Sequence, residues 1–139
     1  MKLISIVTPC YNEEKNILLL YEEIRKIFNS ANIKNQYNYE HIFIDNNSTD
    51  NTINVLKKLA KQDKKIKVII NTRNFGHIRS PFYALLQTKG DAAIMMSSDF
   101  QDPPKLIIDF IKKWEEGFKV VIGVKNKSRE NKLIFLVRR

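Results

Sequence analysis

Short β-rich runs alternate regularly with amphipathic helical patterns along this chain, and the alternation limits the folds it can adopt. Strands separated by helices form parallel sheets that helices cover, so the pattern predicts an α/β fold. The run Ala92–Met96 is apolar on both faces, as strands of a buried parallel sheet are. Strands are expected at residues 3–9, 40–45, 66–71, 92–97 and 119–124.

Between these runs, apolar residues repeat at steps of three and four, as a helix with one buried face requires. Ser48 and Asp50 precede the second of these segments, and we interpret them mainly as helix caps. Helices are expected over residues 17–28, 53–60 and 106–114, with a shorter helix over residues 78–88 that Gly90 ends.

Composition indicates one globular domain. The chain has 139 residues, of which 43% are hydrophobic and 28% are charged. A single cysteine, Cys10, excludes an internal disulfide and a multi-cysteine zinc site. No apolar run approaches the roughly 20 residues of a membrane-spanning helix, and the first residues lack a signal-peptide cleavage site. We therefore expect this chain to be cytoplasmic.

The formal net charge of +9 favours anionic partners. The lysines of residues 57–67 are interpreted as a solvated helix face. Residues 125–139 interleave basic side chains with the apolar run 133–137, which predicts a membrane-adjacent amphipathic segment; an ordinary last helix or strand of a larger domain is the alternative. Nucleic acid is not an expected partner, because the chain has no recognised nucleic-acid-binding module and no clustered aromatics.

Polar and acidic residues gather where three of the predicted strands end, at Thr8–Glu14, Asp45–Asp50 and Ser97–Pro104. Ligands of open parallel sheets bind beyond these carboxyl ends. Carboxylates collected in a basic protein indicate a cation site or specific hydrogen-bond acceptors, and helix N-termini at the same edge favour phosphate. Together these features suit a metal-chelated pyrophosphate.

Each of these residues also has a structural interpretation. For Asp45, at a strand terminus, ligand contact is favoured over helix capping, and for Asp99 metal coordination is favoured. Asp102 precedes two prolines, so capping and catalysis both stay open. Tyr11 could pack in the core or form a platform on which a base stacks.

The segments Ser5–Glu14 and Ile44–Asp50 resemble the first two strand ends of family 2 glycosyltransferases. Arg73–His77 and Ser98–Pro104 resemble a narrower branch, which includes dolichol-phosphate mannose synthase and bacterial polyprenyl-phosphate glycosyltransferases. Four motifs in the same order make the resemblance specific, and it covers about residues 4–129.

The resemblance implies a GT-A (Rossmann-like) fold, with helices on both faces of a mostly parallel sheet and residues 1–139 as its N-terminal nucleotide-sugar-binding part. It implies an enzyme that transfers a sugar, with inversion, from a UDP- or GDP-linked donor to a polyprenyl phosphate at the cytoplasmic face of a membrane. The sugar stays open, and a homo-oligomer is possible.

The resemblance also implies roles for individual residues. Nucleoside contacts would come from Pro9, Tyr11 and Glu13, a hydrogen bond to the base from Asp45, and a nucleotide contact from Arg73. Asp99 would hold Mg²⁺ or Mn²⁺, and Asp102 is the candidate catalytic residue that orients the acceptor or the sugar. The diphosphate and sugar would lie beside Ser97, Ser98 and Gln101.

Two departures from the family pattern bear on activity. The usual Asp-x-Asp metal motif reads Ser97-Ser98-Asp99, so we expect metal to arrive largely with the donor. Family domains continue well beyond the fifth strand, so we expect a truncated chain that transfers sugar poorly. The alternative is an inactive or degenerate nucleotide-binding module. A nicotinamide dehydrogenase is disfavoured, since no Gly-x-Gly-x-x-Gly follows the first strand, and a sugar nucleotidyltransferase would carry a glycine-rich first loop.

Overall fold

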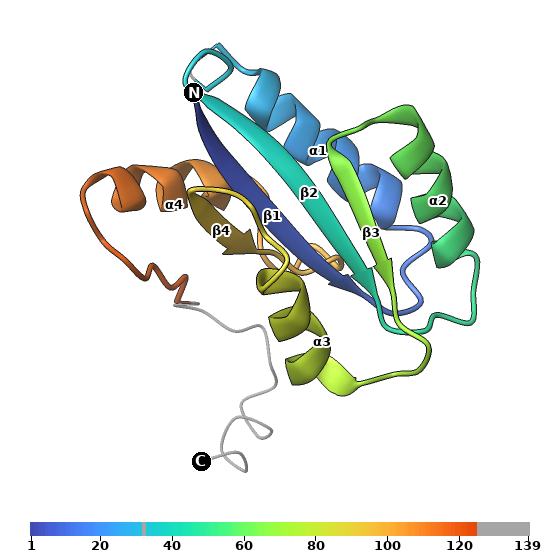
Figure 1. The fold of residues 1–139 in the computed structure, drawn as a ribbon. Coiled ribbons are helices and arrows are strands. Elements are labelled where there is room, and N and C mark those ends of the chain that lie inside the picture. Colours follow the sequence, from blue (N-terminus) through green and yellow to red (C-terminus); the bar gives the residue numbers. More distant parts are fainter. Residues whose placement is uncertain (32, 125–139) are drawn as a thin grey trace, which may run out of the picture.

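The computed structural model describes residues 1–31 and 33–124, which form a four-stranded parallel sheet with helices on both faces (Figure 1). The elements follow in the order β1 (Lys2–Cys10), α1 (Ile17–Asn29), β2 (Tyr37–Asp45), α2 (Thr52–Gln62), β3 (Ile66–Ile70), α3 (Gly76–Leu85), β4 (Ala92–Met95) and α4 (Leu106–Glu115).

The strand order is β3-β2-β1-β4, with β1 hydrogen-bonded to β2 on one side and to β4 on the other. The chain therefore builds the sheet outward from β1 to β3 and then crosses back to place β4 beside β1. In open α/β sheets such a reversal leaves a crevice at the carboxyl ends of the two strands, where ligands bind. The crevice here lies beyond the ends of β1 and β4.

Three helices pack on one face of the sheet and α3 packs alone on the other (Figure 1). On the first face, Ile4 and Ile6 of β1 are buried in one cluster with Leu20 and Ile24 of α1 and with residues of α4. A second cluster joins α1, α2 and β2 on the same side. On the opposite face, α3 contributes Ala84 to a smaller cluster with residues of β1 and β2. The predicted α/β class and parallel sheet are confirmed.

A buried carboxylate ties the α3–β4 connection to the sheet. Glu40 accepts hydrogen bonds from Ser5 Oγ (2.6 Å) and from the Lys89 amide (2.7 Å), and it is paired with Lys67. Burial alone would raise the pKa of Glu40, but these hydrogen bonds outweigh it and lower the pKa. A Cβ at Gly90 would lie 2.6 Å from Ser5 Oγ. Position 90, five residues after α3 ends, therefore requires glycine, because its backbone lies too close to β1 to leave room for a side chain.

The expected fifth strand at residues 119–124 is wrong. The segment is irregular, and Val120, Ile122 and Val124 are 76–77% exposed. Branched apolar residues favour strands because they pack on a pleated, half-buried surface. No strand in residues 1–31 and 33–124 pairs with residues 119–124, so this segment has no sheet surface on which its branched side chains could pack. The interpretation of residues 125–139 falls outside the described residues.

The ends of β4 and α3 also differ from expectation. β4 ends at Met95, before Ser97, and Met95 is 45% exposed, so this edge strand is not buried on both faces. The third helix begins at Gly76 and ends at Leu85, so it starts and ends earlier than predicted. Among the helices of the described residues, none has the length and apolar character to cross a membrane.

Candidate functional site

The loop after β1 is joined to the loop after β2 by side chain to backbone hydrogen bonds. Asn12, in the left-handed region at φ 57°, accepts hydrogen bonds from the Thr49 amide (2.8 Å) and the Asp50 amide (3.4 Å) through Oδ1. Its own amide donates to Ser48 Oγ (2.9 Å). Asparagine tolerates this backbone conformation better than most residues. Asn12 therefore links the loop after β1 to the loop after β2 through both its side chain and its backbone.

Three further bonds continue the same join. The Glu13 amide donates to Thr52 Oγ1 (2.8 Å), and the Glu14 amide donates to Asp50 Oδ2 (3.3 Å). In return the Asn51 amide donates to Glu14 Oε2 (3.0 Å). Backbone amides of each loop thus donate hydrogen bonds to side chains of the other loop. Because the bonds run in both directions, the two loops form one rigid rim at the edge of the sheet.

Asp45 is fully buried and holds the turn after β2. It accepts hydrogen bonds from the Ser48 amide (2.9 Å) and from Ser48 Oγ. The structure therefore does not bring Asp45 into an open hollow, and its predicted contact with a base stays a prediction. The cap expected at Ser48 is wrong, because its hydroxyl bonds Asp45 and Asn12 instead of α2. Asp50 does accept the first amide of α2, from Thr52 (3.0 Å).

A hollow of about 340 Å³ opens beside this rim, between the ends of β1 and β4 and the start of α3. Four predicted site residues line it: Pro9, Tyr11, Glu13 and Ser98. Tyr11 is 49% exposed, so its ring is available for stacking rather than packed in the core. The remaining lining residues were not predicted, and they are Cys10, Asn46, Asn74, Gly76, His77, Ser80 and Pro81.

Asn46 organises the far wall of the hollow, and sequence reasoning missed it. Its Nδ2 donates to Asn74 Oδ1 (2.8 Å) and to the Gly76 carbonyl (3.3 Å). Its Oδ1 accepts from the Phe75 amide (2.8 Å) and from Asn71 Nδ2 (3.2 Å). One amide thus fixes the loop that leads into α3. Its position directly after Asp45 at a strand end is the signal that could have singled it out.

Arg73 does not line the hollow. Its guanidinium lies 4.8 Å from the Phe75 ring, and both side chains are exposed. The structure therefore does not bring Arg73 together with Pro9, Tyr11 and Glu13, and its contact with a nucleotide stays a prediction.

The segment after β4 lies along the same edge. Ser98 is buried, and its hydroxyl donates to the Pro9 carbonyl (3.2 Å), which holds the ends of β1 and β4 together. Ser97 Oγ is 3.4 Å from Asp102 Oδ2. Asp99 is exposed, and its Oδ1 accepts the Gln101 amide (3.1 Å).

A second, larger hollow of about 630 Å³ adjoins the segment after β4. Gln101 and Asp102 line it, together with apolar residues of α4 and of the irregular segment 118–124. The predicted residues are therefore divided between two hollows, with Ser98 in the smaller one and Gln101 and Asp102 in the larger.

The fit of a divalent cation depends on Asp99. In the described part of the chain, no group of three or more His, Cys, Asp or Glu side chains is placed to hold a metal. The exposed carboxylate of Asp99 and the hydroxyls of Ser97 and Ser98, which directly precede it in the chain, supply oxygen donors of the kind that suits Mg²⁺ and Mn²⁺. These residues fit such an ion as part of its shell, with phosphate oxygens and water supplying the rest.

Cys10 is a poor nucleophile despite its place in the hollow. Burial, and then the nearby Asp45 and Glu13 carboxylates, raise the pKa of the thiol well above its usual value. The thiol therefore stays protonated at neutral pH. Covalent chemistry through this cysteine is disfavoured.

Comparison with known proteins decides the family. The model of glycosyl transferase family 2 matches residues 5–137. The chain belongs to glycosyltransferase family 2. This family 2 chain is 35% identical over 125 residues to the uncharacterized glycosyltransferase YkcC of Bacillus subtilis, covering 90% of the chain and 38% of YkcC. It is 34% identical over 131 residues to the bactoprenol glucosyl transferase of Shigella phage SfX, covering 94% and 42%. The predicted family is confirmed, and the name of the phage relative agrees with the polyprenyl-phosphate branch.

Solved structures confirm the GT-A fold. TarS 1-349 of S. aureus superimposes with a TM-score of 0.64 and 26% identity, covering 84% of this chain and 33% of TarS. The mannosyltransferase PcManGT of Pyrobaculum calidifontis superimposes with a TM-score of 0.59 and 20% identity, covering 80% and 31%. The family 2 chain spans about two fifths of the length of the curated relatives it matches.

Proposed function

We propose that the chain is the donor-binding part of an enzyme that transfers a sugar from a nucleotide-diphosphate sugar to a polyprenyl phosphate. The observation that carries the proposal is the hollow at the reversal point of the sheet, whose rim is held by the joined loops after β1 and β2. Two comparisons support it. TarS 1-349 has been solved in complex with UDP, and a phage relative is a bactoprenol glucosyl transferase.

The nucleoside would bind in the smaller hollow. Tyr11 offers a half-exposed ring on which a base can stack, and Pro9 and Glu13 form the wall beside it. Asp45 lies under the rim and would accept a hydrogen bond from the base once Ser48 turned away from it. Arg73 would close over the nucleotide from the loop before α3. These roles are proposals for which the placement of Pro9, Tyr11 and Glu13 is the main support.

The diphosphate would lie along the segment after β4. Asp99 would hold Mg²⁺ or Mn²⁺ there, and Ser97, Ser98 and Gln101 would lie beside the phosphates and the sugar. A divalent ion held there by Asp99 would neutralise charge on the departing diphosphate. Because the chain supplies one exposed carboxylate at this position, Asp99, the metal would enter together with the donor.

Transfer would join an oxygen of the acceptor phosphate to the anomeric carbon as the bond from that carbon to the diphosphate oxygen breaks. The acceptor oxygen would attack from the side opposite the departing diphosphate, so the configuration of the anomeric carbon would invert. A phosphate monoester is ionised near neutral pH, so no strong base has to remove a proton. Asp102 would orient the acceptor or the sugar from the larger hollow, and rate acceleration would come mainly from positioning. A lipid acceptor would place the reaction at a membrane, and we propose the cytoplasmic face.

A thermal-shift screen with UDP- and GDP-linked sugars tests the donor site. We expect stabilisation with Mg²⁺ or Mn²⁺, because ligand at 100 times its Kd adds about 2.7 kcal/mol to the free energy of unfolding. That gain corresponds to a rise in Tm of roughly 8 °C for a chain of this size. Asp99→Asn should abolish the shift. Asp109→Asn removes the same charge from an exposed position on α4 and should leave the shift intact.

Two results would contradict parts of the proposal. Equal stabilisation by the nucleotide sugar without metal would reject metal binding by Asp99, but it would still agree with donor binding in the smaller hollow. Absence of stabilisation by every nucleotide sugar would reject the donor site itself. Ser97, in place of the usual first carboxylate, favours a second candidate, a nucleotide-binding module without catalysis. Metal-dependent transfer to a polyprenyl phosphate that Asp99→Asn abolishes would reject that candidate.

A further inference from the structure

Helix α3 is apolar on the side that faces away from the sheet. Its sheet side carries the small residues Ser80, Pro81 and Ala84, all buried. Helices that cover a sheet normally place their large apolar residues inward and their polar residues outward. On α3, by contrast, the large apolar residues Ile78, Phe82 and Leu86 are exposed.

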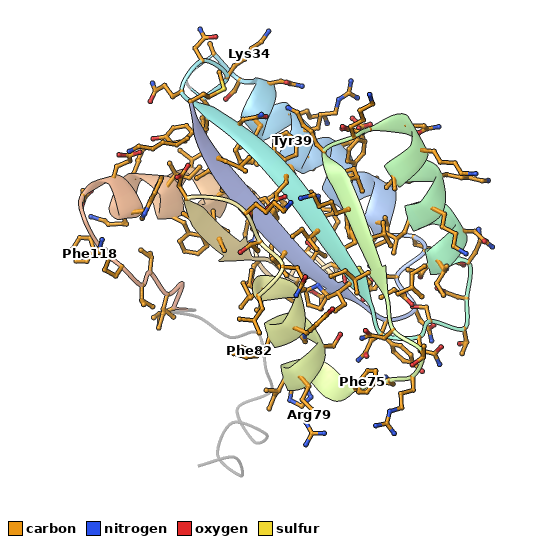
Figure 2. All side chains as sticks on the ribbon, viewed as in Figure 1. Lys34, Tyr39, Phe75, Arg79, Phe82 and Phe118 are labelled. Carbon is orange, nitrogen blue, oxygen red and sulfur yellow. The ribbon has the colours of Figure 1, made fainter. Side chains whose placement is uncertain are left out.

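The outward residues form one continuous stripe, because they repeat at steps of three and four. Ile78 is 71% exposed, Phe82 60% and Leu86 66%. Figure 2 shows Phe75, Arg79 and Phe82 projecting outward from this part of the molecule. We call this stripe the α3 surface, and its members are Phe75, Ile78, Arg79, Phe82, Tyr83 and Leu86.

The chain segment that carries the α3 surface has charged side chains of one sign. Residues 64–90 contain six Lys and Arg residues and no Asp or Glu, although the whole chain has 15 acidic residues. Lys67 is paired with the buried Glu40 of β2. Within residues 1–31 and 33–124, neither Arg73 nor Arg79 forms an ion pair; Arg73 instead lies over the Phe75 ring. Arg73 and Arg79 therefore add positive charge to the exposed apolar stripe, and no ion pair among the described residues compensates it.

We propose that the α3 surface docks on an anionic lipid bilayer. Exposed apolar and aromatic side chains insert between headgroups, and the arginines beside them are attracted to anionic lipid. A contiguous apolar patch without such a partner is uncommon on a soluble protein. Charge complementarity selects the anionic bilayer as the occupant, since Arg73 and Arg79 would give no specific advantage against a neutral apolar partner.

The position of the surface gives docking a consequence for the site. The α3 surface begins at Phe75, whose amide is held by Asn46, and the smaller hollow is lined by Gly76 and His77 at the start of the same helix. Docking through α3 therefore places that hollow close to the headgroup layer. The inference rests on the proposed function only in this respect, because a lipid acceptor would reach the donor from that layer.

Co-sedimentation of the 139-residue chain with vesicles tests the proposal. We compare vesicles of phosphatidylglycerol and phosphatidylcholine with vesicles of phosphatidylcholine alone, and expect binding to the anionic ones. Ile78→Ser combined with Phe82→Ser should weaken this binding at least tenfold. Arg79→Gln should weaken it about fivefold, since each basic residue near an anionic surface adds about that factor.

Matched variants on the opposite face provide the controls. Leu18→Ser with Leu19→Ser removes two exposed leucines of α1, and Lys58→Gln removes one exposed lysine of α2. Both helices lie across the sheet from α3, so these variants should bind vesicles as the unchanged chain does. Far-UV circular dichroism and urea unfolding of every variant show that the fold is retained.

A positive measurement of insertion completes the test. Phe82→Trp should be quenched by lipids brominated in their acyl chains, whereas Leu19→Trp should not, beyond the background of Trp114. Equal vesicle binding by the α3 and α1 variants would overturn the proposal. So would a lipid-free dimer that Ile78→Ser with Phe82→Ser dissociates.

Failure of docking and failure of the donor site are distinguishable. The α3 variants should keep the metal-dependent thermal shift with nucleotide sugars, which is measured without lipid. Asp99→Asn should lose that shift and keep vesicle binding. If the unchanged chain shows only one of the two properties, the property that is missing identifies which of the two proposals is wrong.

Discussion

His41 lies in the interior of β2 with its imidazole fully buried. Its Nε2 is 2.9 Å from Thr8 Oγ1, and its ring centroid is 3.8 Å from that of Phe43. Nδ1 has no hydrogen-bond partner among the described residues. Burial lowers the pKa of this imidazole to about 3, because the charged form loses its hydration.

This shift predicts acid sensitivity of the fold. An unfolded histidine takes up a proton below about pH 6.5, whereas folded His41 stays neutral until about pH 3. Between these values the unfolded state binds more protons, so the free energy of unfolding should fall as pH is lowered. The slope from this one group is at most about 1.4 kcal/mol per pH unit. Urea unfolding from pH 7 to pH 4 measures it.

The variant His41→Gln isolates this contribution. Glutamine can keep a hydrogen bond to Thr8 but does not titrate. The free energy of unfolding of this variant should therefore change less with pH than that of the unchanged chain. Identical slopes for His41→Gln and the unchanged chain would show that His41 is hydrated enough to be protonated in the native fold.

At the scale of residues, the sequence located the site better than it located individual contacts. Pro9, Tyr11 and Glu13 reach one hollow because they follow β1 at the reversal point, and that position follows from the order of strands and helices. Asp45 and Arg73 do not reach it in this structure. Their side-chain directions depend on Ser48 and Phe75, partners that periodicity and strand-end position do not reveal.

At the scale of elements, the joined loops after β1 and β2 form the rim of the hollow, and Asn12 joins them from a left-handed backbone position. We predict that Asn12→Gly lowers the free energy of unfolding by about 1–2 kcal/mol, through loss of its acceptor contacts. Asn12→Ala should cost about 1 kcal/mol more, because alanine also strains the backbone at φ 57°.

Both variants should weaken binding of a nucleotide sugar, because the rim that positions Tyr11 loses its join. Thermal shifts with and without the donor measure this loss. Asn54→Ala changes an exposed asparagine of α2 and should alter stability by less than about 0.5 kcal/mol. Equal effects of Asn12→Gly and Asn12→Ala would mean that the loop relaxes out of the left-handed conformation.

Elements were predictable in type but less so in their ends. The repeat of apolar residues predicted α1, α2 and α4 because each buries one long stripe against the sheet. It misplaced α3, whose large apolar residues face outward and whose first turn is set by Asn46 bonding the loop before it. The segment 119–124 has the composition of a strand but no neighbouring strand to pair with. Composition does not reveal whether such a neighbour is present.

At the scale of the whole molecule, the sheet order implies a gradient of local stability. β1 and β2 are hydrogen-bonded on both sides, whereas β3 and β4 each have one strand neighbour among the described residues. Both edges of β1 and β2 are thus covered by other strands, and their side chains fill the largest core clusters. Local opening of these strands requires most of the fold to open.

We therefore predict a ranked pattern of amide hydrogen exchange for the 139-residue chain. Amides of β1 and β2 should exchange only through global unfolding, with a free energy of opening equal to that from urea unfolding. Amides of β3 and β4 should be less protected, and those of Val120 and Ile122 should exchange close to the unprotected rate, since both side chains are more than three-quarters exposed. Strong protection at Val120 and Ile122 would mean that this segment pairs as a strand, as its β-branched composition suggests. In that case the larger hollow around Asp102 would be narrower than it is here, because this segment forms one of its walls.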